Sequence, residues 1–196
     1  MSRRTHALRR IAWGLAVAVL ATPALAQAQQ RNDEEYTRLI KQYLQDPRIT
    51  TELVDHLPAS ETVPTPLKFH GRIVGTPGEL TYAKDIHRYF KAIDEASPRA
   101  TIWSLGQTEE GREMIVMAIA DEQTIADIEK YKGYLGELTD PRKTSEERAR
   151  ALIGGVAKPI YWLTAGMHSG ETGGPEMLQE LAYRLVVEET DFIRSI

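Results

Sequence analysis

The chain has 196 residues, of which 42% are apolar and 27% are charged, so it is long enough to bury one sizeable core. Its formal net charge of −4 argues against a nucleic-acid partner, because such partners require a basic surface. It contains no cysteine, which excludes disulfides and thiolate metal sites, so any bound metal must use histidine and carboxylate ligands.

Residues 1–26 have the pattern of a secretory signal peptide. A start with four arginines is followed by an apolar run over residues 11–20 and by small residues that end at Ala26, as a cleavage site requires. A membrane anchor is the alternative, but the apolar run is shorter than the roughly 20 residues of a span, and Pro23 interrupts its end. Removing the segment takes away four arginines and no acidic residue, so the formal net charge falls from −4 to −8. We therefore expect a secreted or periplasmic protein, cleaved near Ala26, without a stable membrane anchor afterwards.

Residues 27–78 predict an N-terminal helical extension and linker. Short helices are expected over residues 34–44 and 51–57, and three prolines within residues 58–66 indicate a linker. Residues 67–78 follow as a connecting stretch with glycine turns, expected to pack on the main domain or on a neighbouring one. No cluster of metal-ligating residues occurs in this part of the chain.

Residues 81–120 predict a helix followed by a β-hairpin. Apolar residues recur at helical spacing over residues 81–96, and Ser97 and Pro98 end that helix. His87 lies in it and is interpreted as an ordinary helix histidine, because no second ligand type stands four residues later. Residues 100–105 and 114–120 have strand patterns, and Gly111 provides the turn between them.

Residues 122–155 predict an inserted pair of helices. The second helix opens at Thr144-Ser-Glu-Glu147, which resembles a capping box, and Gly154 and Gly155 end it. The many charges of this segment indicate a solvated face. A role in restricting which substrates enter is the alternative.

Residues 158–187 contain the candidate metal site. An apolar strand pattern over residues 158–167 runs into His168 and Glu171, and a helix is predicted directly afterwards. An imidazole at a strand end and a carboxylate one tight turn later can reach the same point, which suits zinc. Gly173 and Gly174 are expected to allow unusual backbone angles, and Pro175 suits a first helical turn. The site is therefore predicted to lie between a buried strand and a buried helix.

Two separated pieces of the sequence resemble the zinc carboxypeptidase family of the carboxypeptidase A type, most closely its large bacterial secreted members. They are Ser104-Leu-Gly-Gln-Thr-Glu-Glu-Gly-Arg112, with the strand after it, and His168-Ser-Gly-Glu171. The resemblance implies that residues 79–196 are the amino-terminal half of an α/β domain with a mixed sheet flanked by helices. It also implies one Zn²⁺ ion, a peptide or protein substrate, and His168 and Glu171 as metal ligands.

The same resemblance implies residues that cannot be assigned in this sequence. In the family a further histidine ligand, the substrate-binding arginines and the glutamate general base come later in the domain, and residues 172–196 contain no histidine. We therefore expect the chain to be the front portion of a longer protein, with catalytic and substrate-binding residues unknown. Gly111 and Arg112 are predicted to hold the hairpin turn, a structural role. Three charged residues of the last predicted helix are expected on its solvent side: Glu176, Glu180 and Arg184.

Three interpretations of the chain remain open. The first is a secreted zinc metallocarboxypeptidase that hydrolyses peptide bonds with metal-activated water. The second is a non-catalytic periplasmic module with this fold that binds peptides or cell-wall material. In the third, His168 and Glu171 merely brace a turn. Zinc dependence separates the first two, and loss of zinc on replacing His168 separates the first from the third.

Overall fold

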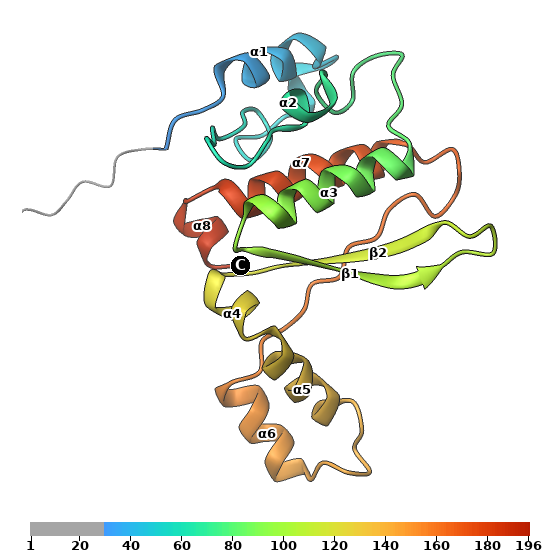
Figure 1. Cartoon of the computed structure of the whole chain (residues 1–196). Helices are drawn as coiled ribbons and strands as arrows, with labels where there is room; N and C mark the ends of the chain where they lie inside the picture. The colour runs from blue at the N-terminus through green and yellow to red at the C-terminus, as the bar shows by residue number, and fades with distance from the viewer. Residues whose placement is uncertain (1–29) are drawn as a thin grey trace, which may run out of the picture.

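The computed structural model describes residues 30–196, so the predicted signal peptide lies outside the described residues. Helices and strands follow one another along the chain, and the α/β fold class is confirmed (Figure 1). The elements are α1 Glu34–Tyr43, the 3-10 helix η1 Pro47–Ile49, α2 Pro66–His70, α3 Ala83–Ala96, β1 Ala100–Gln107, β2 Glu113–Ile119, α4 Glu122–Ala126, α5 Ile128–Leu138, α6 Glu146–Gly155, α7 Gly173–Val187 and α8 Asp191–Arg194.

The elements form layers around the helix pair α3 and α7. Figure 1 shows the segment with α1 and α2 on one side of this pair and the β1–β2 hairpin on the other, while α5 and α6 project beyond the hairpin. Helices α3 and α7 pack directly against each other. The extension before α3 is thus part of the packed structure of the described residues.

The main core lies between the extension and the helix pair. Its buried side chains come from both sides of that boundary: Tyr36, Leu57, Val63, Ile73, Tyr89, Ile93, Ala100, Ala182, Tyr183, Val186 and Val187. The hairpin contributes less, since Met117 and Ile119 are only partly buried against this core. Burial of apolar side chains is the main stabilising force in folding, so the extension supplies much of the stability of α7.

The predicted helix over residues 81–96 and the predicted hairpin are confirmed. Helix α3 buries Ile86, Tyr89 and Ile93 on one face, as the spacing of its apolar residues predicts. Strands β1 and β2 pair in antiparallel register from Ala100 opposite Ile119 to Gln107 opposite Glu113. A bulge falls between Ser104 and Gly106, which interrupts the register.

The predicted helical insertion is also confirmed. The Asp121 carboxylate accepts the backbone N–H of Thr124 at the start of α4, and the Ser145 hydroxyl accepts that of Arg148 at the start of α6. Such side-chain caps satisfy backbone N–H groups that have no partner inside the helix. Helices α5 and α6 are further joined by the ion pair between Arg148 and Glu137, at 2.9 Å.

The predicted helix over residues 51–57 is wrong. This segment forms a single turn in which Val54 and Asp55 both donate their N–H to the carbonyl of Thr51. Helical structure occurs instead on either side of it. Pro47 opens η1 behind the cap of Asp46, and Pro66 opens α2 behind the cap of Thr65. Proline stabilises a first helical turn because its ring fixes the backbone angle and its missing N–H costs nothing there.

The predicted strand before His168 is wrong as well. Residues 157–166 form no strand, and the side chains of Ile160, Tyr161 and Trp162 are exposed by 64%, 86% and 63%. A strand requires a neighbour that pairs with its N–H and C=O groups. Within residues 30–196 the sheet contains only β1 and β2, and this segment pairs with neither.

Among the helices of residues 30–196, none has both the length and the hydropathy of a membrane span.

Candidate metal site

The structure brings His168 and Glu171 together in the loop that precedes α7. Nδ1 of His168 lies 2.6 Å from Oε1 of Glu171. The backbone N–H of His168 donates to Oε2 of Glu171 at 3.3 Å, and the backbone N–H of Glu171 donates to the carbonyl of His168 at 3.0 Å. These contacts close a compact turn that presents a nitrogen and a carboxylate at the same place.

Both side chains are open to solvent, with exposed fractions of 75% for His168 and 52% for Glu171. The backbone beside them borders an open hollow of about 450 Å³, lined by Thr164, Ala165, Gly166, Met167 and Glu171. An ion or a ligand can therefore reach the pair directly.

The contact with His168 also changes the acidity of the Glu171 carboxylate. The hydrogen bond with the His168 ring, and then the backbone N–H of His168, lower the pKa of Glu171. A lowered pKa keeps the carboxylate ionised under mildly acidic conditions, which is the form that binds a cation.

The donor set suits zinc. Imidazole nitrogen and carboxylate oxygen are two of its usual ligands, with bond lengths near 2.1 Å. Two ligands of one tetrahedral zinc lie roughly 3.4 Å apart. The observed 2.6 Å is a hydrogen-bond distance, so the two side chains have to separate slightly to hold an ion. Their exposure leaves room for that rotation.

Helix α7 supports the loop through close contacts with its first turn. A Cβ atom built on Gly166 would meet Cγ of Pro175 at 2.9 Å, and one built on Gly174 would meet Cβ of Ala165 at 2.8 Å. Gly166 also has a φ of +74°, which favours glycine. The expectation that Gly173 and Gly174 adopt unusual backbone angles is wrong, because neither has a positive φ. Gly174 matters because its missing side chain leaves space for Ala165.

The loop is supported on one side only. The loop was predicted to lie between a buried strand and a buried helix. The buried strand is wrong, since residues 161–170 are all exposed. Residues 165–166 lie against the first turn of α7, and this contact fixes the loop within the described part of the chain.

The expectation that Glu176, Glu180 and Arg184 face solvent is wrong. The exposed fractions of Glu176 and Arg184 are 8% and 6%, and burial raises the pKa of Glu180. The segment before α3 covers this face of α7 and supplies a partner to each residue: the backbone N–H groups of Gly75 and Thr81 to Glu176, the hydroxyl of Tyr36 to Glu180, and the carbonyl of His56 to Arg184. The sequence pattern missed this because the partners lie 95 to 144 positions away in the chain.

The remaining predicted residues lie away from the loop. Gly111 occupies the hairpin turn with a φ of +73°, and Arg112 donates its backbone N–H to Thr108 and pairs its side chain with Glu110. His87 is half-buried on α3 and its pKa is lowered by that burial.

No group of three or more histidine, aspartate or glutamate side chains within residues 30–196 is placed to hold a metal. The two histidines of the extension have other partners: His56 pairs with Asp55 at 2.6 Å, and His70 contacts Gln179 at 2.9 Å. His168 and Glu171 thus meet as a pair of donors, with no third histidine or carboxylate placed beside them in the described part of the chain.

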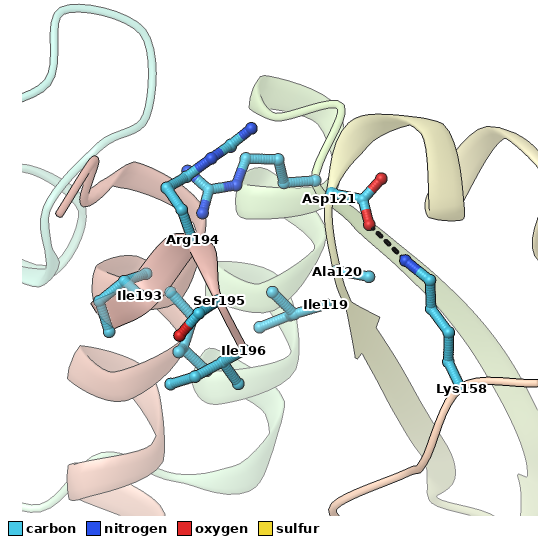
Figure 2. A pocket seen from close by; sticks show the side chains of 10 residues that line it. Ile119, Ala120, Asp121, Lys158, Ile193, Arg194, Ser195 and Ile196 are labelled. Carbon is cyan, nitrogen blue, oxygen red and sulfur yellow. Dashed lines mark hydrogen bonds and ion pairs between the residues drawn. The ribbon is translucent and has the colours of Figure 1, made fainter. Parts of the chain in front are cut away.

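A second, smaller cavity of about 130 Å³ lies at the carboxyl end of α7 (Figure 2). Lys158 and Asp121 pair on one side of it at 2.8 Å, and Arg194 stands on the other side, where it pairs with Glu122 at 3.0 Å. These charges are paired, whereas Arg99, which also lines the cavity, has a buried Nε without a hydrogen-bond partner among the described residues. The lining contains no histidine, so the exposed loop at the other end of α7 is the stronger candidate for a metal site.

Comparison with known proteins gives one match. The family model described as zinc carboxypeptidase matches residues 86–195, which include most of α3, the hairpin, the insertion, the His168 loop and α7. Neither a curated protein nor a solved structure matches the chain.

Proposed function

Since the chain belongs to the zinc carboxypeptidase family, we propose that it is a secreted, zinc-dependent metallocarboxypeptidase that hydrolyses peptide bonds. The observation that carries the proposal is the pairing of His168 and Glu171 in one solvent-open turn within the matched region. We assign these two residues as ligands of one Zn²⁺ ion. The third ligand, the general base and the substrate-binding residues are not assigned among residues 30–196.

The bound ion supplies a Lewis acid that polarises a carbonyl and activates water for attack. The contribution of this chain is to hold the two donors. The turn closed by the backbone N–H of Glu171 keeps the imidazole and the carboxylate within reach of one point.

The substrate class is a peptide or protein, and the location is the periplasm or the outside of the cell. The predicted signal peptide supports the location. The open hollow beside Glu171 supports the substrate class, because an extended peptide needs an accessible groove rather than a closed cavity.

A non-catalytic peptide-binding or cell-wall-binding module is the second candidate. One observation favours it: the described residues contain no group of three metal ligands, whereas catalytic zinc sites typically have three protein ligands. Such a module binds peptide without a metal, so zinc dependence separates the two candidates.

The test incubates the purified chain with an amino-blocked tripeptide, either with zinc or with a chelator, and measures both the bound peptide and the released carboxyl-terminal residue. The proposal predicts that the interaction with peptide requires zinc and is lost in His168→Ala, with His87→Ala as the matched control. Peptide binding that persists with chelator and in His168→Ala would favour the non-catalytic module. Absence of any zinc-dependent interaction would contradict the proposal.

A further inference from the structure

The polar face of α7 is bonded to the segment before α3 at four residues, which are Glu176, Gln179, Glu180 and Arg184. Closest to the metal loop is Glu176, five residues after Glu171, which is 8% exposed. Its Oε1 accepts the backbone N–H of Thr81 at 2.9 Å and its Oε2 accepts that of Gly75 at 3.4 Å. A buried carboxylate needs such donors, so this residue fixes the chain before α3 against the first turns of α7.

Gln179 connects the extension directly to the first turn of α7. Its side chain is fully buried, and its Oε1 lies 2.9 Å from Nε2 of His70. Its Nε2 donates to the carbonyl of Pro175 at 3.4 Å. The amide therefore bridges the end of α2 and the residue whose ring lies against Gly166.

These contacts form a continuous path from the extension to the metal loop. The side chain of Gln179 contacts both His70 and the carbonyl of Pro175. The Pro175 ring lies against Gly166, and His168 follows Gly166 two residues later in the chain. The loop has no buried residue of its own between positions 161 and 173, so its position depends on the first turn of α7.

We infer that the extension positions the zinc loop through Gln179 and Glu176, which act as positioning residues for His168 and Glu171. The inference rests on the proposed function for its zinc component. Its structural component, that the loop is held by the extension, stands on contacts that involve no metal. The extension therefore contributes to the metal site although it contains no ligand.

The test compares Gln179→Met and Glu176→Gln with the wild-type chain. Gln179→Met keeps a similar side-chain volume and removes both amide bonds. Glu176→Gln keeps the shape of the side chain and one of its two acceptor oxygens. It is therefore expected to fold even if Gln179→Met does not. Met177→Gln is the matched control, since Met177 neighbours both residues on α7 but is 49% exposed.

The first readout is metal-free: hydrogen exchange of the His168 and Glu171 amides, measured by NMR. The inference predicts faster exchange at these two amides in both variants, with unchanged exchange in α5 and α6 and wild-type behaviour in Met177→Gln. Unchanged exchange at His168 and Glu171, in a variant whose residues 70–81 exchange faster, would overturn it.

The second readout is the zinc dissociation constant, expected to rise about tenfold in the variants, as for other residues that orient metal ligands. Wild-type zinc affinity in both variants would overturn the zinc component. Zinc binding by the His168→Ala chain separates a failure of the proposed function from a failure of this inference. If it binds zinc as the wild type does, the proposed function fails, while the exchange result still decides whether the extension positions the loop.

Discussion

Tyr36 on α1 donates a hydrogen bond to Glu180 on α7, with Oη 3.0 Å from Oε2. The two residues are 144 positions apart, and burial raises the pKa of both. This bond joins the extension to the family region inside the core, so disrupting it tests whether the two parts stabilise each other.

Replacing Tyr36 by Phe should destabilise the chain by about 1–3 kcal/mol, because a buried carboxylate loses its hydroxyl donor. Urea unfolding followed by circular dichroism measures the change. Tyr43→Phe is the matched control: Tyr43 lies on the same helix, and its hydroxyl makes no hydrogen bond within the described residues. Equal stabilities of the two variants would contradict the role assigned to the Tyr36 bond.

Glu180→Gln should change the pH dependence of stability. Because burial raises the pKa of Glu180 in the folded state, the folded chain binds a proton more tightly than the unfolded chain does. The stability of the wild type should therefore rise as the pH falls from 7 towards the ordinary glutamate pKa. The amide introduced by Glu180→Gln cannot titrate, so this variant should be relatively more stable at pH 7, and its advantage should shrink at lower pH. A stability difference that does not vary with pH would contradict the assignment.

Gly166→Ala should displace the loop that contains His168 and Glu171. A left-handed backbone costs a residue with a Cβ about 1–2 kcal/mol, and the new methyl group would also meet Pro175 at 2.9 Å. We expect a lower melting temperature than in Gly170→Ala, where the Cβ meets nothing within 4 Å and φ is not positive. Equal melting temperatures would show that residues 165–166 do not pack on α7 as described.

The exposed apolar run at residues 160–163 should promote self-association. Trp162 is 63% exposed and Tyr161 is 86% exposed in an unpaired extended segment, a combination that favours aggregation. Trp162→Lys should reduce light scattering of a concentrated solution without lowering the melting temperature. Leu80→Lys, at a position 56% exposed outside this run, is the control and should change the scattering less. A larger effect of Leu80→Lys would assign self-association to another surface.

The features that the sequence predicted correctly are those that depend on nearby residues. Helix α3 follows from its apolar spacing and the hairpin from two strand patterns around Gly111. The start of α6 was predicted to within one residue, since its cap is Ser145 and not the first residue of Thr144-Ser-Glu-Glu147. The meeting of His168 and Glu171 also belongs to this class, because a turn of three residues decides it.

The features that the sequence did not predict depend on distant partners. Residues 158–164 have an apolar strand pattern, but a strand forms only where another strand pairs with it, and no local signal reports that neighbour. Glu176 and Glu180 have the residue type of a solvated face, but Glu176 is buried and Glu180 is partly buried, because Thr81 and Tyr36 in the segment before α3 donate hydrogen bonds to them. Gly166 was missed because its importance comes from contact with Pro175.

If His168 and Glu171 bind one zinc ion together, equilibrium dialysis of the chain against excess zinc should detect that ion. Excess zinc is required because two protein ligands bind the ion only weakly. We expect one bound zinc per chain for the wild type and for His87→Ala, and loss of that zinc in both His168→Ala and Glu171→Ala. Zinc retained at the wild-type level in His168→Ala would contradict it.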